Sequence, residues 1–267
     1  MRKIKMDVSK IKKKPLVLAF FLHLLLMAPG ALSAEDKILV LTEQLYPMNY
    51  TENGSDDGII LGFATQLVIE ILEEAKLEYE INMVPWARAI HSIDNNKNVI
   101  VYTMTRSPER QKKYHWIGDI WIGKINLYGH RDKLKNWPLS LAQIRKLKVG
   151  TSRGSVSRDY LMQNGFRDIV TIKSMDSYMR LLDRGRIDLF PFLDFSVGMA
   201  AKRQGFDKRN LISVLSLTAI PLNLAIAASK STDIKTVKLL QSSYTKIRQS
   251  SRYKTIMAPL EEMIADF

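Results

Sequence analysis

The sequence contains no cysteine, and this absence excludes several kinds of chemistry at once. A chain without thiols forms no disulfide, offers no thiolate nucleophile, binds no cysteine-ligated metal and carries no lipid anchor on cysteine. Histidine is also scarce: His23, His91, His115 and His130 are scattered, without the short spacings typical of metal ligands. We therefore expect neither a metal site nor a cofactor.

Nucleic-acid binding is not expected either, although the chain carries a net charge of +13. Residues 1–34 hold seven basic side chains and one acidic side chain, so nearly half of the excess belongs to this short stretch. No basic run with interleaved aromatic residues follows it, and such runs are the usual mark of a nucleic-acid surface. No serine–histidine–aspartate spacing and no pair of cleft carboxylates is readable, so an exported enzyme is the least favoured hypothesis.

Residues 1–34 have the three parts of a secretory signal peptide. A basic stretch, 1–14, precedes an apolar stretch, 15–27, and the dipeptide Pro29-Gly30 then leads to small residues ending at Ala34. This pattern predicts cleavage after Ala34 and export across the inner membrane to the periplasm. The alternative is a membrane anchor, but the apolar stretch is shorter than the ~20 residues that span a bilayer.

The stretch from Thr103 to Arg110 is the strongest candidate for a binding site. The apolar run 99–102 predicts a strand, and Thr103 and Thr105 would point the same way if the strand continues. Pro108 ends the hydrogen bonding of this strand to its neighbours. Arg110 follows at the strand's carboxyl end, where α/β sheets bind small ligands. Two hydroxyls and a guanidinium fork predict a carboxylate site. The alternative is a solvated turn with an ordinary surface arginine.

The same stretch resembles the family 3 periplasmic solute-binding proteins, which include the polar amino-acid receptors of ABC transporters. Ser107 to Arg110 reads Ser-Pro-Glu-Arg, and Tyr114 to Gly118 stands where the family has its Val-Asp-Phe-Ser run. The resemblance implies that Arg110 grips the carboxylate of a ligand and that Thr105 and Thr103 assist it.

The resemblance implies an α/β chain with the two-lobed Venus flytrap fold, in which two crossover strands join the lobes. The expected first lobe is 35–124 plus 221–267, and the expected second lobe is 125–220. The lobes would close around a small ligand, because the ligand touches both of them only in the closed form. We expect a monomer.

Two segments of the first lobe supply further candidate contacts. The family places an aromatic or acidic contact in the loop 43–50, where Glu43 and Tyr46 are candidates, and the alternative for both is a packed loop. Trp86 stands where the family has an apolar floor for the ligand. A tryptophan next to Arg88 at a strand-to-helix turn would stack on a ligand and pair with an anion. The alternatives are a core tryptophan and a helix-surface charge.

Two segments of the second lobe complete the predicted site. A strand, a glycine and then a helix starting with hydroxyl residues is an anion-binding arrangement. The resemblance implies that Gly154, Ser155 and Val156 bind the same carboxylate, Val156 through its backbone alone, although Ser155 is also a plain N-cap candidate. The family has an ammonium-binding aspartate after the strand that follows Gly185, and Asp194 is the nearest carboxylate, about one residue late.

The leading functional hypothesis is a periplasmic receptor for a small, carboxylate-bearing, amino-acid-like solute, which it delivers to an ABC permease. The second is a binding protein of the same fold that signals rather than transports. Ala64 and Gln66 stand where the family has acidic residues, so the chain departs from an ordinary amino-acid receptor. The sequence does not identify the solute.

Overall fold

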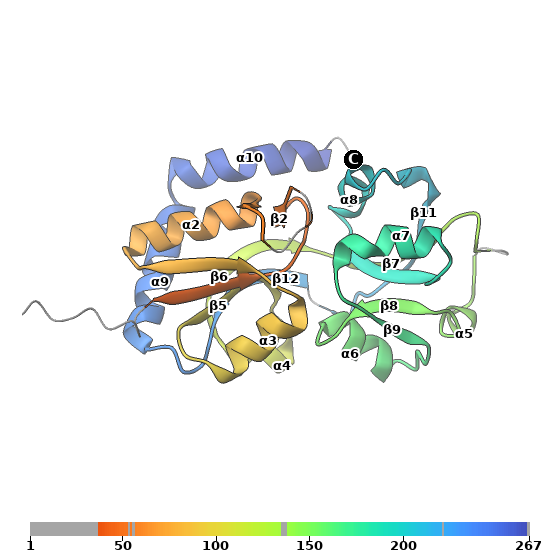
Figure 1. The fold of residues 1–267 in the computed structure, drawn as a ribbon, viewed down its shortest axis with the longest axis horizontal. Coiled ribbons are helices and arrows are strands. Elements are labelled where there is room, and N and C mark those ends of the chain that lie inside the picture. Colours follow the sequence, from red (N-terminus) through yellow and green to blue (C-terminus); the bar gives the residue numbers. More distant parts are fainter. Residues whose placement is uncertain (1–36, 53, 55–56, 135–137, 221, 266–267) are drawn as a thin grey trace, which may run out of the picture. The chain divides into compact units, whose positions relative to one another are not determined.

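Ten strands of the described residues form two mixed five-stranded sheets in this computed structural model (Figure 1). The structure describes residues 37–267 apart from 53, 55–56, 135–137, 221 and 266–267. The predicted signal peptide, 1–34, lies outside the described residues.

The first sheet has the order β4-β1-β5-β12-β6. Its strands are β4 (Tyr79–Met83), β1 (Ile38–Thr42), β5 (Val99–Thr105), β12 (Leu222–Ala228) and β6 (His115–Gly123). β1 runs parallel to β4 and β5, whereas β12 runs antiparallel to β5 and β6. All seven residues of β5 are buried, because this strand lies at the centre of the sheet and is covered on both faces.

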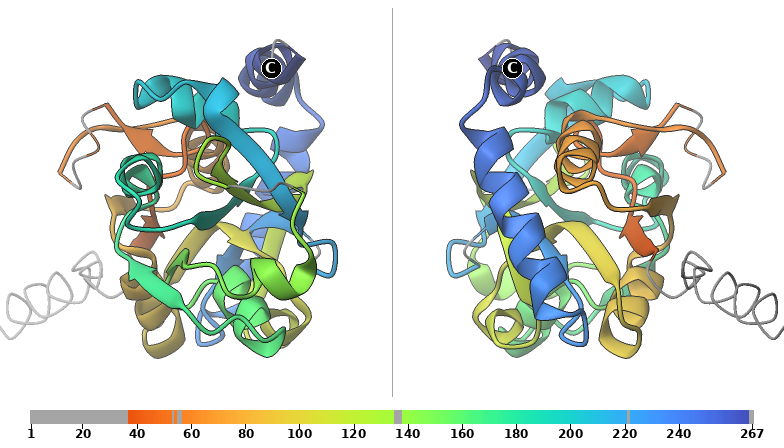
Figure 2. Two further views of the ribbon diagram at one scale, coloured as in Figure 1. Left: turned by 90° about the vertical axis from the view of Figure 1, so that its right-hand side faces the viewer. Right: turned by 90° about the vertical axis from the view of Figure 1, so that its left-hand side faces the viewer.

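Helices cover both faces of the first sheet (Figures 1 and 2). They are α2 (Phe63–Ala75), α3 (Trp86–Asn95), α4 (Pro108–Gln111), α9 (Ile234–Arg248) and α10 (Ser251–Ala265). The buried residues of α2 recur every three or four positions, so the helix turns one apolar stripe inward and packs against α9 and α10. α3 packs on the other face, where Trp86, Ala89 and Ile93 meet side chains of β5.

The second sheet has the order β11-β7-β10-β8-β9. Its strands are β11 (Leu211–Ser216), β7 (Ile125–His130), β10 (Leu189–Leu193), β8 (Val149–Ser152) and β9 (Ile169–Ile172). Its helices are α5 (Leu141–Ile144), α6 (Val156–Gln163), α7 (Tyr178–Asp183), α8 (Val197–Arg203) and the 3₁₀ turns η1 (Met175–Ser177) and η2 (Lys208–Asn210). Tyr178 stacks on Phe190 with their ring centroids 5.1 Å apart, which ties α7 to the sheet.

The chain passes between the sheets twice. β6 ends at Gly123 and β7 begins at Ile125, so Lys124 alone separates a strand of the first sheet from one of the second. Asp194 brackets this residue: its backbone N–H donates to the Lys124 carbonyl at 3.0 Å, and its carboxylate accepts from the Lys124 N–H at 3.1 Å. β11 and β12 make the return passage, so the strands confirm the predicted α/β class with two crossings.

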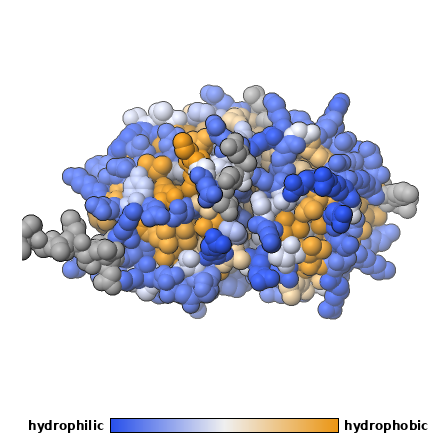
Figure 3. Space-filling model, viewed as in Figure 1, coloured by the Kyte–Doolittle hydropathy of each residue, from blue (hydrophilic) through white to orange (hydrophobic). Residues whose placement is uncertain are grey.

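The surface of the described part is mostly hydrophilic on the face drawn in Figure 3. Apolar side chains gather there in separate areas among charged and polar ones. A short hairpin of β2 (Tyr50–Thr51) and β3 (Ile60–Leu61) lies outside the two main sheets. Within residues 37–267 as described, no helix is both long and apolar enough to cross a membrane.

Candidate functional site

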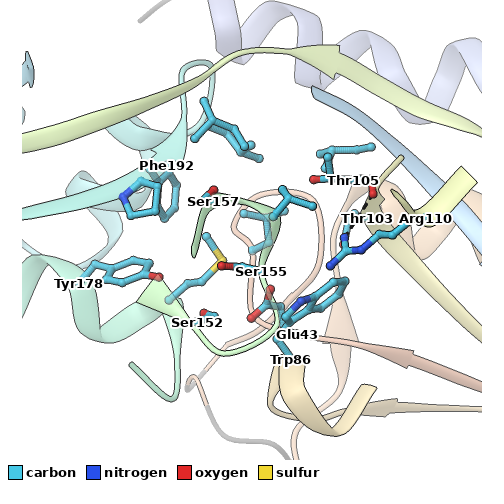
Figure 4. Close-up of a pocket in the computed structure, with 17 residues that line it drawn as sticks. Glu43, Trp86, Thr103, Thr105, Arg110, Ser152, Ser155, Ser157, Tyr178 and Phe192 are labelled. Atoms are coloured by element: carbon cyan, nitrogen blue, oxygen red, sulfur yellow. Dashed lines mark hydrogen bonds between the residues drawn. The ribbon is translucent and has the colours of Figure 1, made fainter. Parts of the chain in front are cut away.

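A cavity lies where residues from strands of both sheets and from the segments that follow them meet (Figure 4). Its space free of protein atoms is about 590 Å³, a figure that includes the part open to solvent. Seven residues predicted from the sequence line it: Glu43, Trp86, Thr103, Thr105, Arg110, Ser155 and Val156. The structure thus brings these residues together, and their contact with a ligand stays a prediction.

Arg110 reaches across the cavity from the first sheet's side. It lies in α4, which begins where the Ser107 hydroxyl accepts from the Arg110 N–H at 3.4 Å and Pro108 takes the first helical position. Its guanidinium donates to the Thr105 carbonyl at 3.2 Å and to the Gly154 carbonyl at 2.8 Å. A guanidinium has five N–H donors in a planar fork, and these two bonds use two of them. Burial lowers the pKa of Arg110, yet guanidinium groups stay charged in proteins.

The two threonines behind Arg110 do not follow a simple strand alternation. Thr103 has φ 55°, in the left-handed region, and the pairing of β5 with β12 shifts register nearby. A β-branched residue there is an outlier that costs about 1–3 kcal/mol, and such strain gathers at binding sites. The Thr103 hydroxyl donates to the Tyr102 carbonyl at 2.6 Å, and both threonines still line the cavity.

Trp86 forms one wall of the cavity and also contacts the second sheet's side. It is the first residue of α3, directly after Pro85, and it is 5% exposed. The Arg110 guanidinium lies 5.5 Å from the centre of its ring, within cation–π range. Its indole N–H donates to the Gly154 carbonyl at 3.1 Å, so this carbonyl accepts from both Trp86 and Arg110.

The segment around Gly154 presents hydroxyl groups to the cavity. Gly154 has φ 73°, a left-handed turn that glycine adopts without strain and that joins β8 to α6. Ser155 is the N-cap of α6, and its hydroxyl accepts from the Arg158 N–H at 3.2 Å. Ser155 is therefore both a cap and a cavity residue, since the two roles are compatible.

Glu43 brings the one acidic group among the described lining residues. Burial raises the pKa of its carboxyl to about 8, and the charge of Arg110 opposes that shift. A carboxyl in such a place holds its proton near neutral pH until a cation arrives.

Three residues predicted as contacts do not line this cavity. Tyr46 instead packs against Arg203, whose guanidinium lies 4.9 Å from the ring centre. Arg88 is exposed on the solvent side of α3, because its position in the helix turns it away from the buried stripe. Asp194 brackets Lys124, and its carboxylate also accepts from the Phe195 N–H at 2.9 Å. The structure therefore does not bring these three residues together with the other candidates in this cavity, and their contact with a ligand stays a prediction.

Further lining residues were not predicted from the sequence. The second sheet's side adds Ser152, Ser157, Met175, Tyr178, Pro191 and Phe192. The Tyr178 hydroxyl is hydrogen-bonded to Ser152, and burial raises its pKa. Apolar residues such as Phe192 read as ordinary core in a sequence, so only the serines near Ser155 carried a usable signal. Among the described residues, no group of three or more histidine or acidic side chains is placed to hold a metal ion.

Comparison with known proteins gives a match over most of the chain. The model of the bacterial extracellular solute-binding proteins, family 3, matches residues 38–259. A search of curated protein sequences gives no match.

Solved structures match over nearly their whole length. A histidine kinase sensor domain with similarity to periplasmic binding proteins has a TM-score of 0.71 at 18% identity, over 84% of this chain and 95% of that one. A mutant of ArgBP from T. maritima has a TM-score of 0.70 at 17% identity, over 85% and 96%. The amino acid ABC transporter substrate-binding protein AbpA from Streptococcus pneumoniae, bound to L-arginine, has 0.70 at 16%, over 86% and 96%. These identities show the fold alone, and they confirm the predicted two-lobed fold.

Proposed function

This chain belongs to the bacterial extracellular solute-binding proteins of family 3, and from that premise we propose that it captures a small, carboxylate-bearing, amino-acid-like solute. It delivers this solute from the periplasm to an ABC permease of the inner membrane. It works as a monomer, without a cofactor, after its leader is cleaved near Ala34. The family is one of binding proteins rather than enzymes.

The observation that carries the proposal is the meeting of Arg110 with hydroxyls from both sheets in one cavity. Thr103 and Thr105 come from the first sheet, and Ser152 and Ser155 from the second sheet's side. A carboxylate between them accepts charge-assisted hydrogen bonds from the guanidinium fork and further bonds from the hydroxyls. Few other solute groups present two oxygen acceptors in the geometry that matches a planar guanidinium fork.

Lobe closure supplies the coupling between binding and delivery. We take the lobes as 35–124 with 221–267, and 125–220, a division supported by the membership of the two sheets. A solute that touches Arg110 and Ser155 together favours the closed form by its differential affinity for that form. A permease that recognises the closed form then receives loaded protein.

A thermal-shift screen of the purified protein with amino acids and small organic acids tests the proposal. A ligand that binds only the folded state stabilises it by RT ln(1 + [L]/Kd), or about 2.7 kcal/mol at one hundred times Kd. The matched control is the primary amide of each hit, which lacks the carboxylate charge and should give little or no shift. A screen in which no carboxylate-bearing compound stabilises the protein would contradict the proposal.

A sensing role is the second candidate, and one observation favours it. The sensor domain of a histidine kinase is among the structures with the same fold. Affinity purification of the exported protein with its loaded solute separates the two roles. Recovery of permease subunits supports delivery, and recovery of a membrane kinase without permease subunits supports sensing.

A further inference from the structure

Two ionisable side chains of opposite kind line the cavity. Among its described lining residues, Arg110 is the one basic side chain and Glu43 the one acidic side chain. The guanidinium is charged and the carboxyl becomes charged beside a cation, and buried charges are costly unless each has a partner. The lining therefore complements a solute with one negative and one positive group.

The Glu43 carboxyl is available to such a positive group. Its backbone carbonyl accepts from the Asn49 side chain at 2.5 Å, while its carboxyl oxygens have no hydrogen-bond partner among the described residues. Arg110 of α4 and Tyr178 of α7 are the titratable groups that face it, and Asp94 and Asp159 act on Arg110 from further out. Glu43 and Arg110 line the same cavity, so one small solute in it can contact both.

No other described carboxylate competes for this role. Asp194, which the sequence places nearest to an ammonium contact, does not line the cavity and accepts two backbone N–H groups beside Lys124. Asp176 is adjacent to the lining residue Met175, but its charge partner is Arg203. Glu43 is thus the carboxyl within reach of an amine next to a carboxylate held by Arg110.

Phe192 and Tyr178 lie on the side of the cavity away from Arg110 in Figure 4, and their rings give that side apolar surface beside the serine hydroxyls. Pro191 and Met175 also line the cavity. The rings of Phe192 and Tyr178 pack edge to face with centroids 6.4 Å apart, and Phe192 packs on Phe190 at 5.9 Å, so the wall is held in place. A second cation on the solute would meet no acidic partner there.

Resting on the proposed function, we infer that the solute is a neutral amino acid with an apolar side chain. Its carboxylate binds Arg110, its ammonium binds Glu43, and its aliphatic or aromatic side chain packs against Phe192 and Tyr178. In this respect the chain differs from the fold relative from Streptococcus pneumoniae that is bound to L-arginine.

Proton release is a direct consequence of this arrangement. Burial holds the Glu43 carboxyl protonated in the empty cavity at pH 7, since its pKa is about 8. An ammonium beside it favours the carboxylate, so binding drives the proton into solvent. Affinity then rises with pH up to about 8, as the proton no longer has to be displaced.

Calorimetry with five probes tests the inference on the unmodified protein. We expect L-phenylalanine or L-leucine to bind at least about tenfold tighter than L-arginine and L-glutamate, and tighter than the amine-free 3-phenylpropionate. At pH 7, titrations in buffers of different ionisation enthalpy should show release of close to one proton with the amino acid and none with 3-phenylpropionate. Arginine binding as tightly as leucine, or binding without proton release, would overturn the inference.

Two matched variants locate the amine contact. Glu43→Gln should weaken the amino acid about tenfold or more, leave 3-phenylpropionate within about threefold, and abolish proton release. Asp194→Asn keeps an oxygen acceptor for Lys124 and should leave all three quantities unchanged. The reverse pattern would assign the amine to Asp194 and overturn the inference. If arginine binds best, this inference alone fails, and if no carboxylate binds, the proposed function fails with it.

Discussion

Arg110 and Arg203 each donate hydrogen bonds from residues around one sheet to backbone carbonyls around the other, but only Arg110 lines the cavity. Arg110, from the first sheet's side, donates to the Gly154 carbonyl and lies over Trp86. Arg203, from α8 on the second sheet's side, donates to the Thr51 and Glu52 carbonyls at 2.5 and 2.9 Å. Its guanidinium lies 4.9 Å from the Tyr46 ring and 4.5 Å from the Tyr50 ring.

Each of these two arginines also has an acidic residue nearby. Glu43 accompanies Arg110 and Asp176 accompanies Arg203, and burial raises the pKa of each carboxyl while the arginine opposes the shift. The difference is that Arg110 lines a cavity, whereas Arg203 lies against two rings and two backbone carbonyls. We therefore expect the same residue type to serve recognition in one place and closure in the other.

Loss of Arg110 should have the largest effect on binding. Truncating one partner of a buried, charge-assisted pair costs about 2–5 kcal/mol. At about 1.4 kcal/mol per tenfold, Arg110→Ala should weaken binding of a screened ligand by roughly 30-fold or more. Arg110→Lys should recover only part of this, because an ammonium lacks the fork. Calorimetry on folded variants measures both.

Arg106 offers a matched control for that variant. Its guanidinium also lies over a tryptophan, 5.3 Å from the centre of the Trp116 ring, and donates a hydrogen bond to the Gln111 side chain. Unlike Arg110, it does not line the cavity. Arg106→Ala should bind within about threefold of the parent. If Arg110→Ala also stays within that range, the carboxylate is bound elsewhere.

Loss of Arg203 should act on closure and have the next largest effect. Each of its two cation–π contacts is worth about 0.5–1 kcal/mol at exposed sites, so Arg203→Ala should weaken binding by roughly five- to thirtyfold although Arg203 does not line the cavity. Small-angle scattering of the empty variant should give a larger radius of gyration than that of the parent, since the closed form is less populated.

Arg209→Ala controls for the loss of a positive charge, because Arg209 is exposed and pairs locally with Asp207. It should change neither quantity. Unchanged affinity and unchanged radius in Arg203→Ala would show that this bridge contributes nothing to closure.

Trp86→Phe should have a smaller effect that reports on the Arg110 bridge. Phenylalanine keeps an aromatic ring under the guanidinium but loses the 3.1 Å bond to the Gly154 carbonyl. One neutral hydrogen bond is worth about 0.5–1.5 kcal/mol, which predicts binding weaker by about two- to tenfold. The ligand-induced change in tryptophan fluorescence should disappear. A persistent signal would place the reporter at Trp116 or Trp121.

The pH dependence of stability tests the Glu43 carboxyl in the absence of any ligand. The pKa of Glu43 is raised from 4.5 to about 8, so between these values the folded state holds a proton that the unfolded state has lost. Stability from this group is therefore present at low pH and is lost as pH rises toward 8. Glu43→Gln should flatten the decline in melting temperature between pH 5 and pH 8.5.

Asp176→Asn should also reduce the fall in melting temperature with rising pH, but by less than Glu43→Gln does. Asp176 is partly exposed, so solvent screens its charge. Melting temperatures that fall as steeply with pH in both variants as in the parent would contradict the raised pKa of these two carboxyls.

The sequence predicted those parts of the site that depend on local structure. Ser107 and Pro108 mark the helix start that positions Arg110, and Ser155 caps α6, as a hydroxyl residue before a helix indicates. The fold class followed from the resemblance, and the family match bears it out over residues 38–259.

The rest depended on contacts between distant segments. Nothing near Tyr46 in the sequence indicates that Arg203 packs on it, and nothing near Asp194 indicates that it brackets Lys124. Phe192 and Tyr178 have the burial of core residues, 3% and 2% exposed, so no pattern separates a cavity wall from core. Which face of a buried residue borders empty space is set by its neighbours rather than by its own segment.

The single-residue passage at Lys124 has a mechanical consequence. A connection this short is a candidate hinge, because few backbone torsions separate the directions of β6 and β7. Asp194 is hydrogen-bonded to both the N–H and the carbonyl of Lys124 and so restrains that residue. Hinge motions in proteins take microseconds to milliseconds. In the proposed lobe closure we therefore expect the contacts of Arg110 and Arg203, rather than the turn at Lys124, to set how long a solute is held.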